Sequence, residues 1–271
     1  MSFYTSLTGL KNAQTDLGVI SHNIANAETG GFKKSRTNFA DIVSRSILTD
    51  PSLTTGLGAR VSSIQQEFSL GPIEQTGSAL DLAINGEGFF TVRSPVSGQT
   101  TVTRAGSFTL DGDGFVKSSE GERLQLFEID ANGDPVSTGT TIDAQAAPFN
   151  TGGAEFAGIV IDNLGTVKAA YGDGEVVPIG KIALSNFVAP QGLKQIGSAS
   201  WEPTGVSGPI QLGTPGSGRY GSVLSGALER SNVDIAEELV GLITAQRNFQ
   251  ANAKAIDTAT QISQTIINIR N

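Results

Sequence analysis

A heptad pattern of apolar residues near each end of the chain constrains the fold most. In such a pattern apolar side chains recur at alternating spacings of four and three, which places them on one face of a helix. Gly30 and Gly31 follow the N-terminal pattern, and adjacent glycines favour the end of a helix, so we expect this helix to end near Ala27. The apolar members of its stripe are Phe3, Leu7, Leu10, Leu17 and Ile24.

The C-terminal pattern predicts a longer helix, from about residue 234 to residue 269. Asp234 and Glu237 have the spacing of a capping box at its start. At 1.5 Å per residue this helix would be about 50 Å long, against about 35 Å for the N-terminal one, so it would extend beyond its partner. The apolar members of its stripe are Ile235, Leu239, Leu242, Phe249, Ile256 and Ile267.

Polar side chains interrupt both stripes, at Gln14, Ser21, Gln246, Thr260 and Ser263. Polar groups in the seam of a coiled coil reduce its stability, so we expect the two terminal helices to pair weakly within one chain. Their other faces carry mostly Ser, Thr, Asn, Gln and Gly, so further helices are expected to pack there. The apolar stripes would then carry assembly into a filament or tube. The alternative is a solvated helical pair on a monomeric β domain.

The middle of the chain has the texture of an antiparallel β protein. Short alternating apolar runs are separated by Asn-Gly and Asp-Gly pairs, which supply the positive φ angles that tight hairpins need. Three hairpins are predicted, with turns at residues 85–88, 111–114 and 173–174.

The sequence therefore predicts an α+β fold in three discontinuous parts. Residues 1–30 and 232–271 form a terminal helical coiled-coil domain. Residues 31–78 and 205–231 form an extended, irregular linker region, because neither period is sustained there and Gly, Ser, Thr and Pro are frequent. Residues 79–204 form a mainly antiparallel, β-rich body.

Composition narrows the possible partners. The net charge is −8, from 26 acidic and 18 basic residues, so no positive field would attract nucleic acid. No run of about 18 apolar residues is present, so membrane insertion is not expected. The start of the chain lacks a basic and apolar leader, which predicts no cleaved signal peptide. Charged residues make up only 16% of the chain, and such a surface is less costly to bury against further protein.

Catalysis, cofactors and metals are not expected. The single histidine, His22, lies in a helical stretch without a convergent acid, so no catalytic residue is predicted. Asp111 and Asp113 have the spacing of a calcium loop, but Phe115 occupies a position that requires an oxygen ligand. Two other classes stay open: a calcium-dependent extracellular binding module, and a hydrolase whose general base would be Asp81 or Asp173.

A small basic cluster follows the first helix, at Lys33, Lys34 and Arg36. Three charges in a loop predict a solvated segment. The alternative is a contact between subunits, in which an acid-rich neighbour complements the cluster.

Several segments resemble the bacterial flagellar rod and hook axial protein family. Near the start these are Ser6-Leu7-Thr8-Gly9-Leu10, Asn23-Ile24-Ala25-Asn26 and Thr29-Gly30-Gly31-Phe32-Lys33. In the body Leu80-Asp81-Leu82-Ala83-Ile84-Asn85-Gly86-Glu87-Gly88-Phe89-Phe90 is similar to the family's first hairpin, and Leu228-Glu229-Arg230-Ser231-Asn232-Val233-Asp234 is similar to its C-terminal signature. The N-terminal segments are most like a short flagellar hook protein.

The resemblance implies a structural subunit that assembles helically into the hollow hook, a flexible joint that transmits motor torque and encloses the export channel. The alternative it leaves is a distal rod subunit, because residues 142–158 are too short for the outer β domain of many hook proteins. The implied partners are further copies of the chain and the distal rod, hook cap, hook–filament junction and export proteins. The implied location is the extracellular hook or basal-body region of the flagellum, reached by export without cleavage.

Overall fold

Both terminal helices are present, as α1 (Ser2–Ala25) and α2 (Ile235–Ile269). Helix α1 ends two residues before the predicted position, where the Asn26 N–H turns back to the carbonyl oxygen of Asn23. Helix α2 starts where predicted, because the Asp234 carboxylate accepts hydrogen bonds from the N–H groups of Ala236 (2.8 Å) and Glu237 (3.2 Å).

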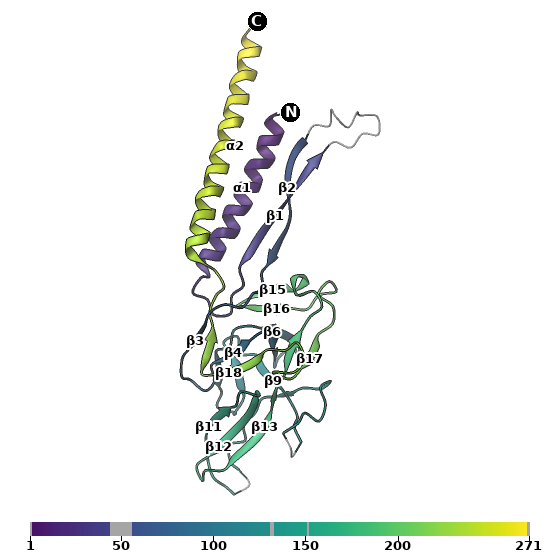
Figure 1. Cartoon of the computed structure of the whole chain (residues 1–271), viewed down its shortest axis with the longest axis vertical. Coiled ribbons are helices and arrows are strands. Elements are labelled where there is room, and N and C mark those ends of the chain that lie inside the picture. The colour runs from purple at the N-terminus through teal and green to yellow at the C-terminus, as the bar shows by residue number, and fades with distance from the viewer. Residues whose placement is uncertain (1, 44–55, 131–132, 151, 270–271) are drawn as a thin grey trace. The chain divides into compact units, whose positions relative to one another are not determined.

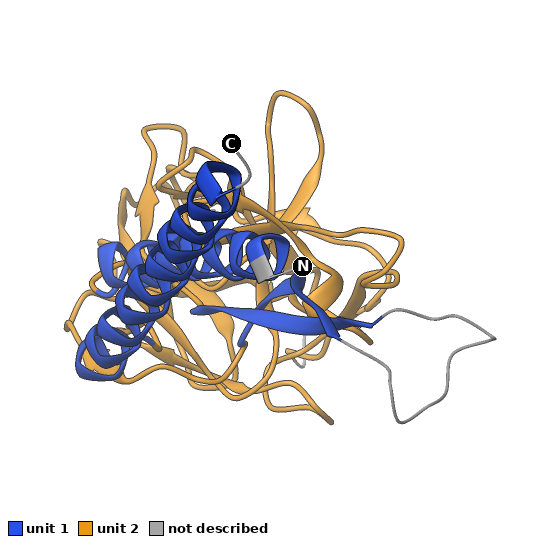
Figure 2. Ribbon diagram, turned by 90° about the horizontal axis from the view of Figure 1, so that it is seen from above, with its two compact units in different colours: residues 1–27, 34–67, 233–271 blue, residues 28–33, 68–232 orange. Residues whose placement is uncertain are grey.

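The computed structural model describes residues 2–43, 56–130, 133–150 and 152–269. The chain divides into two compact units, coloured separately in Figure 2. Unit 1 comprises residues 1–27, 34–67 and 233–271, and unit 2 comprises residues 28–33 and 68–232.

In unit 1 the two helices lie side by side and run antiparallel (Figure 1). Three contacts set their register. Asn23 donates a hydrogen bond to Glu238, Ile20 lies against Gly241, and Gly9 lies against Asn252. The contact at Gly9 is so close that a Cβ atom there would fall 2.5 Å from the Asn252 Oδ1 atom.

A long antiparallel hairpin completes unit 1, formed by β1 (Ser35–Val43) and β2 (Gly56–Gln66). It packs against α1, where Gly58 lies next to Thr8. We expected an irregular linker over residues 31–78, and this prediction is wrong for the two strands of the hairpin. The predicted domain ranges stay a prediction. Register shifts after Asn38 and Ile42 break the alternation that would have predicted the strands.

Unit 2 is built from short strands. They are β3 (Ile73–Gln75), β4 (Leu82–Asn85), β5 (Phe89–Arg93), β6 (Thr100–Thr103), β7 (Phe108–Leu110), β8 (Val116–Ser118), β9 (Arg123–Phe127), β10 (Ile142–Asp143), β11 (Phe156–Ile161), β12 (Thr166–Tyr171), β13 (Val176–Ile182), β14 (Leu184–Asn186), β15 (Lys194–Gly197), β16 (Ser200–Glu202), β17 (Gln211–Gly213), β18 (Ser222–Ser225) and β19 (Ala227–Glu229), with one 3-10 turn, η2 (Pro190–Gly192). Every pairing between them is antiparallel.

Most of these strands belong to one sheet, with the central order β11-β12-β13-β9-β5-β6-β16-β15. Its core includes Leu82, Phe90, Leu124, Leu126 and Ile182, none of which exposes more than 1% of its surface. Strand β17 pairs with β14, β18 with β4 and β19 with β3. The second expected linker therefore also differs from the structure, since residues 205–231 supply strands to the body.

Two of the three predicted hairpins are confirmed, β7–β8 and β12–β13. Gly114 (φ 80°) and Gly174 (φ 85°) supply the positive φ angles at their turns. The third prediction is wrong, because β4 pairs with β18 whereas β5 pairs with β6, β9 and β14. Gly86 (φ 130°) and Gly88 (φ 122°) lie outside the range of a two-residue hairpin turn, and the chain there passes from one sheet to another.

Two close contacts shape the interior of unit 2. Gly106 lies directly against Leu82, whose N–H donates to the Gly106 carbonyl oxygen at 2.9 Å. A Cβ atom at residue 106 would fall 1.6 Å from the Leu82 carbonyl oxygen, so only glycine fits. Elsewhere Trp201, which is fully buried, packs edge-on against Phe68 and Phe89.

Candidate assembly surfaces

The seam between α1 and α2 is one position away from the predicted stripe on α1, whereas on α2 it shares Leu242, Phe249 and Ile256 with the predicted stripe. On α1 the buried residues are Ala13, Ile20 and Asn23. On α2 a series of buried and half-buried residues recurs at spacings of four and three: Glu238, Leu242, Ala245, Phe249, Asn252, Ile256 and Ala259, with Gly241 and Ala253 half-buried beside it. Small residues lie at several seam positions, Ala13, Ala245 and Ala259, and Gly9 and Gly241 lie directly against the facing helix, which lets the two helices approach closely.

The predicted assembly residues divide into two groups. The half-buried group comprises Leu7, Leu10, Leu17 and Ile24 of α1, and Leu242, Phe249 and Ile256, which belong to the seam of α2. The exposed group comprises Phe3, Ile235, Leu239 and Ile267. All five polar residues that were expected to interrupt the seam are exposed, and the polar residues that the seam contains are instead Asn23, Glu238 and Asn252.

Helix α2 carries large apolar side chains that the described part of the chain leaves about half exposed or more. They are 45–80% exposed and comprise Ile235, Leu239, Val240, Ile243, Ile262, Ile266, Ile267 and Ile269. The register of Gly9 against Asn252 places the first turn of α1 opposite Ala259, so the last ten described residues of α2 have no partner helix beside them, and all are exposed. Apolar surface of this extent on one element indicates a binding surface.

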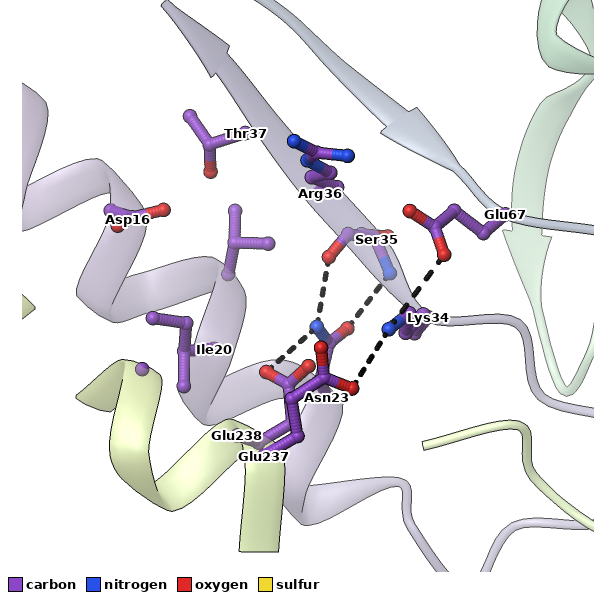
Figure 3. Close-up of a pocket in the computed structure, with 12 residues that line it drawn as sticks. Asp16, Ile20, Asn23, Lys34, Ser35, Arg36, Thr37, Glu67, Glu237 and Glu238 are labelled. Carbon is purple, nitrogen blue, oxygen red and sulfur yellow. Dashed lines mark hydrogen bonds and ion pairs between the residues drawn. The ribbon is translucent and has the colours of Figure 1, made fainter. Parts of the chain in front are cut away.

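A polar pocket lies within unit 1 between α1, β1 and the first turns of α2 (Figure 3). We call it the Asp16 pocket. Its volume is about 190 Å³. Helix α1 contributes Asp16, Ile20 and Asn23, and β1 contributes Arg36 and Thr37.

Asn23 organises one wall of the Asp16 pocket (Figure 3). Its Nδ2 group donates to the Ser35 carbonyl oxygen (2.8 Å) and to the Glu238 carboxylate (3.2 Å), and its Oδ1 atom accepts from the Ser35 N–H (2.9 Å). One buried amide thus joins the end of α1, the start of β1 and the first turn of α2. Since Asn23 is 1% exposed, these bonds are shielded from water.

Lys34 lies at the rim of the same pocket. Its Nζ atom lies 3.3 Å from a Glu237 oxygen and 3.7 Å from a Glu67 oxygen. Burial alone would lower the pKa of this amino group, but the hydrogen bond to Glu237 and the charges of Glu67, Glu237 and Glu238 outweigh it and raise the pKa. Lys34 therefore stays a cation and partly neutralises the acidic rim.

Lys33, the first member of the predicted basic cluster, is fully buried in unit 2. Its Nζ atom donates to the Glu229 carboxylate (2.5 Å) and to the Ser69 carbonyl oxygen (2.6 Å), and Arg104 donates to the other Glu229 oxygen (3.1 Å). Burial lowers the pKa of Lys33, because the attraction of Glu229 only partly offsets desolvation and Arg104 repels the charge. The interpretation of a solvated loop is wrong for this residue.

The carboxylates considered for catalysis or metal binding take part in turns. Asp81 accepts a hydrogen bond from the Thr76 hydroxyl (2.6 Å), and Asp173 accepts one from Asn150 (2.7 Å). Asp111 forms an ion pair with Lys117 across the β7–β8 turn. Within the described ranges, no three His, Cys, Asp or Glu side chains gather as metal ligands, and neither helix is apolar enough to cross a membrane.

Three family models match the chain. Residues 3–33 match the flagella basal body rod protein model, residues 83–169 the flagellar hook protein FlgE/F/G D1 domain, and residues 224–269 the C-terminal model of the flagellar basal body rod FlgEFG proteins. The matched ranges contain both terminal helices and much of the β body.

Similar proteins extend this result to the whole chain. The flagellar basal-body rod protein FlgG of Bacillus subtilis is 36% identical over 280 residues, covering 99% of this chain and 98% of the relative. The flagellar hook protein FlgE of Salmonella typhimurium is 27% identical over 413 residues, with both chains covered in full. A solved structure, the hook protein FlgE2 of Helicobacter pylori, is 13% identical with a TM-score of 0.25 over 72% of this chain and 43% of that one, too low for a structural conclusion. The near-complete match at 36% identity shows that the chain belongs to the flagellar rod and hook protein family.

Proposed function

We propose that the chain is a structural subunit that assembles with copies of itself into a hollow axial segment of the bacterial flagellum. The observation that carries this proposal is the alignment with a rod protein from end to end, at 36% identity and 99% coverage of this chain. The subunit would then be located in the flagellum, in its hook or basal-body region, and reach it by export without cleavage. Its neighbours would be further copies and the adjoining axial and export proteins.

The exposed face of α2 supports self-assembly on physical grounds. Each apolar side chain that moves from water into a contact contributes roughly 25 cal/mol per Å² of buried area. Ile262, Ile266 and Ile269 recur at spacings of four and three, the pattern of a helix that packs against another helix. The same spacing among the residues buried between α1 and α2 supports a coiled-coil pairing of these helices within each subunit.

Two axial positions fit this family, and we place the distal rod before the hook. The rod relative matches this chain at nearly equal length, whereas the hook alignment spans 413 positions, far more than the 271 residues of this chain. The hook protein therefore contains residues that have no counterpart here. The hook stays the second candidate, because its alignment also covers the whole chain and the matching body model is a hook protein domain.

Electron microscopy of the purified chain tests both the assembly of the chain into an axial structure and the choice between rod and hook. We expect hollow fibres on concentration or seeding, together with a rise in helical circular dichroism. Straight fibres would support the rod, and curved or supercoiled fibres would support the hook. A monomer at all concentrations, with fully formed helices, would contradict the axial subunit and favour a binding module.

A further inference from the structure

The Asp16 pocket carries a negative charge that its own residues do not neutralise. Four carboxylates and two cations line it, which leaves a net charge of −2; they are Asp16, Glu67, Glu237, Glu238, Lys34 and Arg36. Lys34 forms ion pairs with Glu237 and Glu67, and the Asn23 amide donates a hydrogen bond to Glu238. No ion pair reaches Asp16 within the described part of the chain.

A second, independent feature of the same pocket is the hydroxyl group of Thr37. Thr37 is 8% exposed and lines the pocket, and its Oγ1 atom has no hydrogen-bond partner among the described residues. A buried hydroxyl without a partner costs free energy of folding, so a donor that enters the pocket would recover it. The pocket therefore offers a free carboxylate and a free hydroxyl to an incoming donor.

The size and walls of the pocket limit what can enter. A volume of about 190 Å³ accepts the end of a side chain but not a folded element. Val19, Ile20 and Gly241 give it an apolar wall beside the polar groups. A cation on an apolar stem fits this combination, because the stem can pack while the charged end bonds.

Helix α2 presents such a cation on its exposed side. Arg247 is exposed, and no ion pair to it exists within the described residues. Val240 and Ile243 precede it by seven and four residues, so all three lie on one helix face, and both are at least half exposed. We propose that the Asp16 pocket receives the guanidinium group of Arg247 from a second copy of the chain, an inference that rests on the self-assembly proposed above.

Arginine suits this pocket better than the other exposed cation of that face. A planar guanidinium group can donate to the Asp16 carboxylate and the Thr37 hydroxyl at the same time, whereas an ammonium group is a point charge. Lys254 lies seven residues after Arg247 on the same face, but Gln250 and Ala251 precede it in place of large apolar residues. The apolar wall of the pocket would then stay uncovered.

A double-mutant cycle on polymerisation tests the contact. Asp16→Asn and Arg247→Gln should each raise the critical concentration about fivefold to tenfold, the range of a partly buried ion pair. The double variant should be no worse than either single one, because both remove the same contact. Lys254→Gln, the matched control, should change the critical concentration by less than about twofold. Single effects under about twofold, or effects that multiply in the double variant, overturn the inference.

Cross-linking gives a second measurement that needs no polymer. The natural chain has no cysteine, so Arg36→Cys in one chain and Gln250→Cys in another provide the only thiols. Below the critical concentration a bis-maleimide should join the two variants, and Asp16→Asn in the first should reduce the yield at least about threefold. If the natural chain forms polymers but the two cysteine variants are not cross-linked, the Arg247 contact is overturned and the proposed function stands. Failure of the natural chain to polymerise overturns the proposed function, and the heterodimer yield still decides the contact.

Discussion

At the scale of single residues, the carboxylate of Glu229 holds together the charged centre of unit 2. It is 2% exposed and accepts from Lys33, from Arg104 and from the Gly71 N–H at 2.9 Å. Two buried cations thus depend on one anion. An ion pair of this kind adds little over apolar packing, but loss of one partner leaves an uncompensated charge.

Glu229→Gln should lower the free energy of unfolding of unit 2 by about 3–5 kcal/mol, because Lys33 and Arg104 would lose the buried counter-charge that they share. Denaturant unfolding followed by the fluorescence of Trp201, the single tryptophan, measures this change in unit 2.

Glu74→Gln is the matched control for this substitution. Glu74 also pairs with an arginine, Arg230 (3.4 Å), but its side chain is 60% exposed, so its loss should cost about 1 kcal/mol or less. Equal effects of the two substitutions would mean that the buried cations do not depend on Glu229.

Sequence reasoning placed Lys33 in solvent because neighbouring charges usually mark a surface. Its partner lies 196 residues away, and no periodicity links the two positions. The same reasoning succeeded for Asp234, whose capping bonds reach only two and three residues along the chain. Local hydrogen bonds could therefore be predicted, whereas a buried pair between distant segments could not.

At the scale of elements, the exposed apolar face of α2 is expected to form a contact between subunits, which a substitution can test. Leu239→Asp should prevent polymer formation, because a charge would enter a contact between helices and lose its water. The folded monomer should stay intact, since Leu239 is 45% exposed within the chain. Electron microscopy and circular dichroism report the two results separately.

Asn248→Asp serves as the control for Leu239→Asp. Nine residues at about 100° each place residue 248 on the opposite side of α2 from residue 239. Asn248 is exposed, so the same charge is introduced there without entering the Leu239 face. Polymers formed equally well by both variants would show that this face makes no contact between subunits.

The elements themselves could largely be predicted, but their partners could not. The α+β class, both helices and two Asp-Gly hairpins follow from local patterns that act within a few residues. Part of the seam was placed one position away because large apolar residues such as Leu239 were assumed to face inward, whereas Ala13 and Ala245 occupy the seam. Small residues give no hydrophobic signal, although they permit the closest helix packing.

At the scale of the whole molecule, two aspartates with lowered pKa values make the stability of unit 2 depend on pH in the acid range. Burial alone would raise the pKa of Asp143, but hydrogen bonds from Gln125 (2.7 Å) and Arg123 (2.8 Å) outweigh it and lower the pKa below 3.8. Burial alone would also raise the pKa of Asp162. The hydrogen bond from the Thr166 N–H (2.9 Å) and the interaction with Lys168 favour the ionised form and lower this pKa overall.

These lowered pKa values predict the direction of the pH dependence. The unfolded chain binds protons at these groups near pH 3.8, whereas the folded chain does so only at lower pH. Their contribution to stability is therefore full above pH 3.8 and is lost as the pH falls through the folded-state values. Denaturant midpoints measured by Trp201 fluorescence should decrease between pH 5 and pH 2.

Asp143→Asn separates this contribution from general acid effects. The variant should be less stable than the natural chain at pH 7, and its stability should fall less steeply below pH 3.8, because residue 143 no longer titrates. An identical pH profile in the variant would show that Asp143 has the same pKa in the folded and unfolded chains.

The close passage of Gly106 against Leu82 has an evolutionary consequence. A side chain of any size at residue 106 would collide with backbone, and a backbone atom has no alternative rotamer. Every substitution that adds a side chain there is therefore expected to be selected against through folding, whatever the subunit assembles with. Invariance at this glycine would record the architecture of the body, whereas drift at Arg247 or Leu239 would record a change of neighbours.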